Sequence, residues 1–215
     1  MKRLFGAIEI DLAEVEERSF VDDLLNTEPN RLGETFRQTL FQQTRGHPLF
    51  TVELLRGMQE RGDLVQDQQG CWIEGPTLDW ETLPARVEAI IAERIERLPE
   101  PWLQVLTAAS VEGEIFTAEV MARVHGIGEL EMVHGLSDTL ERNHRLIKAE
   151  TVRWLGGQRL SQYRFRHILF QKYLYQRLDA AERVYFHEAI STILETLYQS
   201  DTIPIAGQLA HHFEE

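Results

Sequence analysis

The chain has 215 residues and a mass of 25.0 kDa, which suits one large domain or two small ones. With 43% hydrophobic and 27% charged residues it has a globular composition, which excludes a disordered or collagen-like chain. The single cysteine, Cys71, excludes an internal disulfide and fits a reducing cytoplasm. No run approaches the ~18 apolar residues of a membrane span. The net charge of −13 disfavours DNA and anionic lipid as partners.

The total charge hides an uneven distribution along the chain. Residues 1–140 carry a net charge of −14, residues 141–177 a net charge of +7, and residues 178–215 a net charge of −6. A short basic block in an acidic protein needs a local explanation. Three interpretations of this block are open: surface charge on a β-hairpin, a site for an anion or phosphate, and a contact with nucleic acid.

The first half of the chain is predicted to be mostly helical. Weak alternation of apolar and polar residues over 7–12 predicts a strand. Apolar residues at helical spacing predict three helices, over about 14–25, 32–44 and 48–61. Gly62 ends the third helix, and the pattern of residues 63–75 is typical of a hairpin.

The second half is predicted to contain short helices, a hairpin and then longer helices. The helices are expected over 84–98, 102–110, 117–125, 129–144, 167–178 and 180–199, and Thr117 is a plausible N-cap. Between them, residues 146–150 form one strand, a turn leads to Trp154-Leu155, and Gly156-Gly157 turns the chain towards a strand ending at 163–165. Three helices followed by a hairpin is the order of a winged-helix domain. The predicted fold class is mainly α, with small β-hairpins and no parallel sheet.

Gly46-His47-Pro48 is the first of two notable motifs. As plain helix punctuation, the glycine would supply a left-handed cap and the proline would start the next helix. As a functional motif, the proline would present a rigid, flat surface without a hydrogen-bond donor, which suits packing against a purine ring. Spacing alone leaves both interpretations open.

The second motif covers residues 163–169, Y-R-F-R-H-I-L. It reads structurally as a strand that leads into a helix, with Phe165 and Ile168 in the core and Arg164 and Arg166 in solvent. In a functional interpretation His167 lies at the helix N-terminus, where free backbone N–H groups favour an anion. A histidine beside arginines can donate a charge-assisted hydrogen bond to a phosphate.

The sequence lacks the motifs of several other activities. No G-x-x-x-x-G-K-[ST] phosphate loop occurs, nor G-x-S-x-G or H-E-x-x-H. His211 and His212 are adjacent, so on a helix they point about 100° apart and would not chelate a metal as an i,i+4 pair does. We therefore expect no catalytic residue and no metal site.

The order of the motifs strongly resembles the regulatory half of bacterial STAND-type signalling ATPases, which are related to AAA+, NB-ARC and NACHT proteins and occur in transcriptional regulators and other signal-transduction proteins. The resemblance covers about residues 7–215. It is carried by T-R-G-H-P-L-F-T-V-E-L-L-R at 44–56, L-P-A-R-V-E-A-I-I-A-E-R-I-E-R-L-P at 83–99, Y-R-F-R-H-I-L-F-Q-K-Y-L-Y at 163–175 and L-A-H-H-F at 209–213.

The resemblance implies a division into four parts. Residues 1–12 would be a remnant of the ATPase-domain sheet, and residues 13–75 a helical lid subdomain. Residues 83–200 would be a winged-helix domain, and residues 201–215 the start of a helical, TPR-like repeat. The implied partners are an N-terminal ATPase domain and further C-terminal repeats.

The resemblance also implies a nucleotide site. The family's glycine-x-proline motif matches Gly46 and Pro48, whose proline packs against adenine. The family's winged-helix histidine, which contacts the ADP β-phosphate, matches His167, and Arg166 lies beside it. The aspartate that follows this histidine in relatives is replaced by Ile168.

The same resemblance implies a regulatory role without catalysis. The phosphate loop and the Mg²⁺-binding acid belong to the domain that precedes this region in the family. The chain by itself is therefore expected to hydrolyse no ATP and to hold no cofactor, whereas the full-length protein would bind ATP or ADP with Mg²⁺. Closure of the lid and winged helix over ADP would hold an off state.

Two alternatives come from other classes of function. A DNA-binding winged helix would explain the basic block, but its presumptive recognition helix, residues 129–144, is acidic and would be repelled by phosphates. A protein-interaction module would explain the apolar segment at 203–213, because a repeat helix without its neighbour exposes its stacking face. Such a face also predicts self-association.

Overall fold

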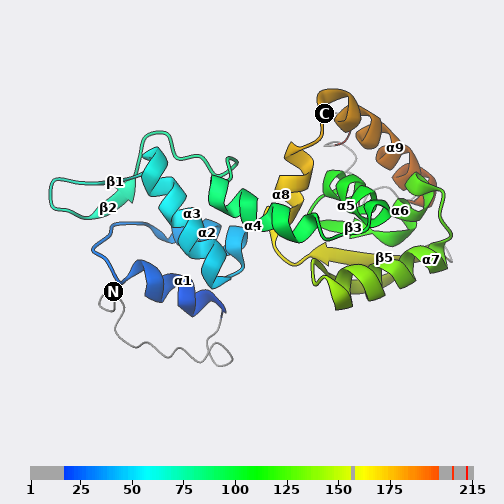
Figure 1. Ribbon diagram of the computed structural model, residues 1–215, viewed down its shortest axis with the longest axis horizontal. Coiled ribbons are helices and arrows are strands. Elements are labelled where there is room, and N and C mark those ends of the chain that lie inside the picture. Colours follow the sequence, from blue (N-terminus) through cyan, green and yellow to red (C-terminus); the bar gives the residue numbers. More distant parts are fainter. Residues whose placement is uncertain (1–16, 156–157, 199–204, 206–211, 213–215) are drawn as a thin grey trace. The chain divides into compact units, whose positions relative to one another are not determined.

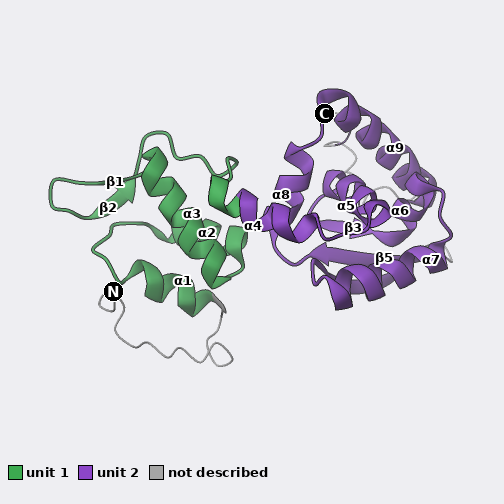
Figure 2. Cartoon of the chain, viewed as in Figure 1, with its two compact units in different colours: residues 1–87 green, residues 88–215 purple. Residues whose placement is uncertain are grey.

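The computed structural model describes residues 17–155 and 158–198 together with Ile205 and His212. The fold is mainly α-helical with two small antiparallel sheets (Figure 1). Among the described residues, no helix combines the length and the apolar character needed to cross a membrane. The chain divides into two compact units, residues 1–87 and 88–215 (Figure 2). The division falls inside a helix, a few residues beyond the linker at 76–82.

Unit 1 is built from three helices and a hairpin. They are α1 (Glu17–Leu25), α2 (Glu34–Thr44), α3 (Pro48–Arg61), β1 (Leu64–Gln66) and β2 (Trp72–Glu74). The predicted helices at 32–44 and 48–61 and the predicted hairpin are confirmed. β1 and β2 pair antiparallel, with Val65 opposite Ile73.

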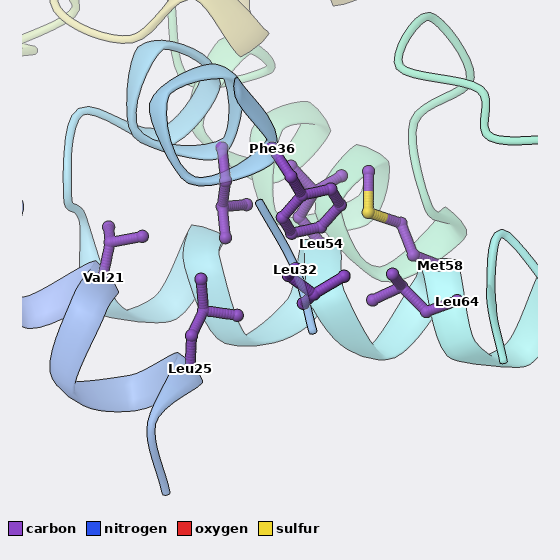
Figure 3. Close-up of a cluster of buried hydrophobic side chains, with 8 residues drawn as sticks. Val21, Leu25, Leu32, Phe36, Leu54, Met58 and Leu64 are labelled. Atoms are coloured by element: carbon purple, nitrogen blue, oxygen red, sulfur yellow. The ribbon is translucent and has the colours of Figure 1, made fainter. Parts of the chain in front are cut away.

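The apolar faces of these helices meet in one core. Figure 3 shows side chains of α1, α2 and α3 pointing towards one another. Phe36 and Met58 are at most 2% exposed, and the ring of Trp80 packs on Phe36 with centroids 5.1 Å apart. Removing such apolar area from water stabilises the unit by ~25 cal/mol per Å².

Unit 2 begins within α4 (Ala85–Ile95) and contains the second sheet. Its other elements are α5 (Glu100–Glu112), β3 (Ile115–Thr117), α6 (Ala118–His125), α7 (Glu129–Gly135), the π-helix η1 (Leu136–Asn143), β4 (Ile147–Leu155), β5 (Gln158–Phe165), α8 (Ile168–Gln176) and α9 (Ala180–Tyr198). The strand order is β3-β5-β4, with antiparallel pairing throughout. Phe116 and Phe165 are buried at the centre of this sheet.

The structure corrects three details of the sequence prediction. The turn expected between Glu150 and Trp154 is wrong, because β4 runs through it and absorbs one extra residue as a bulge between Ala149 and Thr151. β3 was not predicted; its three residues are too few to show a pattern. Thr117 precedes α6 as expected but makes no cap bond, because its hydroxyl donates to Glu112 Oε1 at 2.8 Å.

The chain termini lie mostly outside the described residues. The strand expected at 7–12 is among the residues the structure does not describe. Of the segment at 201–215, the structure describes only Ile205 and His212, and both are buried. Nδ1 of His212 lies 2.7 Å from Nδ1 of His187, so this point of the C-terminal segment packs against α9.

The contact between Gly135 and Trp102 gives a first prediction. A Cβ added at Gly135 would lie 1.7 Å from Cη2 of Trp102. Gly135→Ala should therefore lower the free energy of unfolding by about 1–3 kcal/mol, as overpacking does. Urea unfolding measures the change. In a Trp102→Leu background, which removes the ring, the same substitution should cost much less; an equal cost in both backgrounds would contradict this explanation.

His125, at the end of α6, gives a prediction about pH. Burial lowers the pKa of His125 below its usual 6.5, and its Nε2 is enclosed without a hydrogen-bond partner among the described residues. The unfolded state therefore binds more protons, and stability is lost as pH falls from 6.5 through the lowered pKa. Unfolding measured between pH 7.5 and pH 5 should show a smaller loss in His125→Gln than in the wild type. The explanation fails if His125→Gln loses as much stability as the wild type over this pH range.

Candidate functional site

The Gly46-Pro48 motif forms the corner between α2 and α3. Arg45 and Gly46 both adopt left-handed conformations, with φ of 50° and 68°, and Pro48 is the first residue of α3. The amide of His47 donates to the carbonyl of Thr44 at 2.9 Å. The interpretation as helix punctuation is confirmed for Pro48, which starts α3, but the left-handed C-cap of α2 is Arg45, and Gly46 is a second left-handed residue after it. Glycine suits that position because it adopts positive φ at no steric cost.

Buried hydroxyls hold this corner together. Thr44 and Thr51 are both fully buried, and Thr51 Oγ1 lies 3.0 Å from Thr44 Oγ1 and from the carbonyl oxygen of His47. Thr44 Oγ1 in turn donates to the carbonyl of Leu40 at 2.9 Å. Because the two helices are joined through side chains and backbone, the position of Pro48 is fixed relative to both.

The surface around Pro48 is apolar. Gly46 is buried and Pro48 is half-buried. Leu49, the next residue, is 46% exposed, and Val52, one helical turn after Pro48, is 42% exposed. Together with Pro48 they offer apolar surface for a planar ring.

Arg166 and His167 lie between β5 and α8. His167 is the N-cap residue of α8, has an extended backbone and makes no side-chain cap bond. The α8 N-terminus therefore has backbone N–H groups that a capping side chain does not satisfy. Arg166 is exposed, and its Nε donates a hydrogen bond to the carbonyl of Ile147 at 3.1 Å. This bond holds the guanidinium group at its Nε atom.

Arg94, on α4, belongs to the same neighbourhood and was missed by sequence reasoning. Its Cζ lies 5.3 Å from the centroid of the Phe170 ring, and the His167 ring centroid lies 5.9 Å from that same ring. Burial lowers the pKa of Arg94, and the charges of Arg166 and Arg97 lower it further. In the sequence, the feature that could have indicated Arg94 is its place on the helix beside Ile91 and Ile95, which are buried.

The basic block is partly neutralised within the fold. Arg164 Nη1 donates to Glu114 at 2.9 Å and Arg164 Nε to Glu150 at 3.1 Å, so its pKa is raised chiefly by its hydrogen bonds to Glu150. Arg142 pairs with Asp138. Arg164, three residues before His167 in the sequence, is thus a structural cation.

The four predicted site residues fall into two groups. Gly46 and Pro48 share one corner of unit 1, whereas Arg166 and His167 adjoin Arg94 in unit 2. Within the described ranges, no group of three or more histidine, cysteine, aspartate or glutamate side chains is placed to hold a metal ion. Cys71 is half-buried in the hairpin.

Comparison of the chain with protein-family models, with curated proteins and with solved structures finds no match.

The threonine pair at the α2–α3 corner gives a prediction for this site. Thr51→Val keeps the shape but removes the hydroxyl next to the buried Thr44 Oγ1 and should lower the free energy of unfolding by about 1–2 kcal/mol. Urea unfolding measures the loss. Thr39→Val is the matched control, because its hydroxyl donates to the Thr35 carbonyl at an exposed position where water can replace it. Equal effects of the two substitutions would show that the buried bond does not support the corner.

Proposed function

We propose that the chain is a non-catalytic regulatory module of a cytoplasmic, STAND-type signalling ATPase. In this proposal residues 13–75, within unit 1, are the lid, and residues 83–200, most of which belong to unit 2, are the winged-helix domain. Both help to enclose ADP or ATP bound to a P-loop domain. Exchange of the nucleotide changes which arrangement of the two units is favoured and so switches the protein between off and on states.

The observation that carries the proposal is the grouping of cations at the start of α8. Arg94 on α4 and His167, which directly follows Arg166, come from distant parts of the sequence, yet both lie within 6 Å of the Phe170 ring: the Arg94 Cζ is 5.3 Å and the His167 ring centroid 5.9 Å from its centroid. Cations concentrated beside the N-terminus of a helix are the arrangement that a phosphate requires. In the proposed assembly His167 contacts the β-phosphate.

The corner at Pro48 supports the other half of the proposal. Pro48, Leu49 and Val52 offer apolar surface, and the buried threonines hold that surface in a fixed position. A purine ring gains free energy by covering such a surface, and a proline presents no donor that would be left without a partner. Gly46 allows the tight corner that brings Pro48 to the start of α3.

A second candidate, a protein-interaction module, is favoured by the hairpin of unit 2. Trp154 on β4 is 73% exposed and Val152 is 56% exposed. Two large apolar side chains on one projecting strand are typical of a docking surface. DNA binding is disfavoured by the acidic residues of the α7–η1 segment, which include Glu129, Glu131 and Asp138.

The proposal predicts how ADP affinity depends on His167. The test uses a longer protein in which this chain follows a P-loop domain. There, His167→Ala should weaken ADP binding about tenfold or more, because a charge-assisted hydrogen bond to phosphate contributes ~1.5–3 kcal/mol. Isothermal titration measures the dissociation constant.

The matched control is His134→Ala, since His134 is an exposed histidine on α7. It should leave ADP affinity unchanged. Wild-type ADP affinity in the His167→Ala variant would count decisively against the proposed role of the winged-helix unit.

A further inference from the structure

We propose that a cavity within unit 2, lined by α5, α6, α9 and the C-terminal end of α8, binds a free α-amino acid with a large apolar side chain. The cavity has a volume of about 540 Å³, which lies within the ~300–1,000 Å³ of small-molecule sites. Its lining comes from residues 100–186 alone. The proposal is independent of the nucleotide site, and its test needs no P-loop domain.

The helices around the cavity turn mixed faces towards it. α5 packs on α8 and on α9, and α6 packs on α9. Glu182, Tyr185 and Phe186 of α9 line the cavity, and their spacing of three and four residues places them on one side of that helix. A helix face that only fills a core is apolar. Since the α9 face carries a carboxylate and a phenol beside its phenylalanine, it lines a wet site.

The floor of the cavity is apolar. Leu174 and Leu178 are buried, and Leu103 and Phe186 are half-buried. His125 also lines the cavity, and because burial lowers its pKa it adds no charge near neutral pH. An aromatic or large aliphatic side chain gains free energy when it covers such a floor.

The rim of the cavity carries charges of both signs. Glu100, Arg177 and Glu182 line it and are exposed. Arg177 Nη1 donates to the hydroxyl of Tyr173 at 3.2 Å, and Arg177 forms no ion pair with a carboxylate in the described part of the chain. Glu182 Oε2 accepts the amide of Asp179 at 2.9 Å, which occupies one of its two carboxylate oxygens. The rim therefore offers a cation to a carboxylate and two acids to an ammonium group.

This combination selects the class of ligand. A carboxylic acid without an ammonium group would be repelled by Glu100 and Glu182, and an amine without a carboxylate would leave Arg177 without an anion. An α-amino acid carries both charges on one carbon at the end of its side chain. Its apolar side chain can enter the cavity while both charges stay at the rim, so it matches the floor and the rim together.

The test is calorimetric titration of L-phenylalanine into the 215-residue chain, together with the rise in melting temperature that a ligand of the folded state produces. The wild type should bind L-phenylalanine. We expect 3-phenylpropionate, which lacks the ammonium group, and 2-phenylethylamine, which lacks the carboxylate, to bind about threefold to fivefold more weakly, because each loses one ion pair at an exposed rim. Glycine should bind at least about thirtyfold more weakly, since it leaves the floor uncovered.

Two variants assign the charges of the ligand to the rim. Arg177→Gln should weaken the binding of L-phenylalanine about threefold to fivefold and leave that of 2-phenylethylamine unchanged, because this ligand has no carboxylate. The double variant Glu100→Gln/Glu182→Gln should weaken the binding of L-phenylalanine but not that of 3-phenylpropionate. Glutamine at 182 can still accept the amide of Asp179, so the start of α9 is kept.

The matched control is Arg97→Gln, because Arg97 is exposed, pairs with Glu93 and does not line the cavity. It changes the net charge as Arg177→Gln does and should leave the affinity for L-phenylalanine unchanged. The proposal is overturned if the wild type binds no L-phenylalanine at concentrations up to about 10 mM. It is also overturned if 3-phenylpropionate or 2-phenylethylamine binds as tightly as L-phenylalanine, or if Arg177→Gln has no larger effect than Arg97→Gln. The ligand series on the wild type decides the matter if a variant fails to fold.

Discussion

The start of α8 depends on the register of β5, the central strand of the second sheet. β5 pairs with β3 and β4 at once, and Arg164 lies opposite Ile115 on one side and Lys148 on the other. Its side chain extends this pairing by bonding to Glu114 and Glu150. Since a slip of one residue would exchange the buried and exposed faces, the burial of Phe165 fixes the register and hence the residue at which the strand ends.

From that fixed end the positions of the candidate residues follow. The amide of Arg166 donates to the carbonyl of Leu146 at 2.9 Å, the last backbone bond before the chain leaves the sheet. His167 then becomes the N-cap of α8, and Phe170 lies three residues later on the helix, where Arg94 reaches it. The end of the central strand thus fixes the positions of Arg166 and His167.

The ion pairs of the structure show which cations of the basic block are already neutralised by carboxylates. The basic block of residues 141–177 contains cations with different roles: Arg142 and Arg164 are bound by carboxylates, whereas Arg166 has only a backbone carbonyl among the described residues. Arg166 is therefore a cation of the block that no described carboxylate neutralises.

Local sequence patterns predict the helices, the hairpin at 63–75 and the corner at Gly46-Pro48, because apolar spacing and the backbone preferences of glycine and proline act over a few residues. They also place His167 at a helix start. Only the tertiary structure shows the bulge in β4, the strand β3 and the approach of Arg94 to Phe170. Each of these depends on pairing or packing between residues far apart in the chain, for which a local pattern carries no signal.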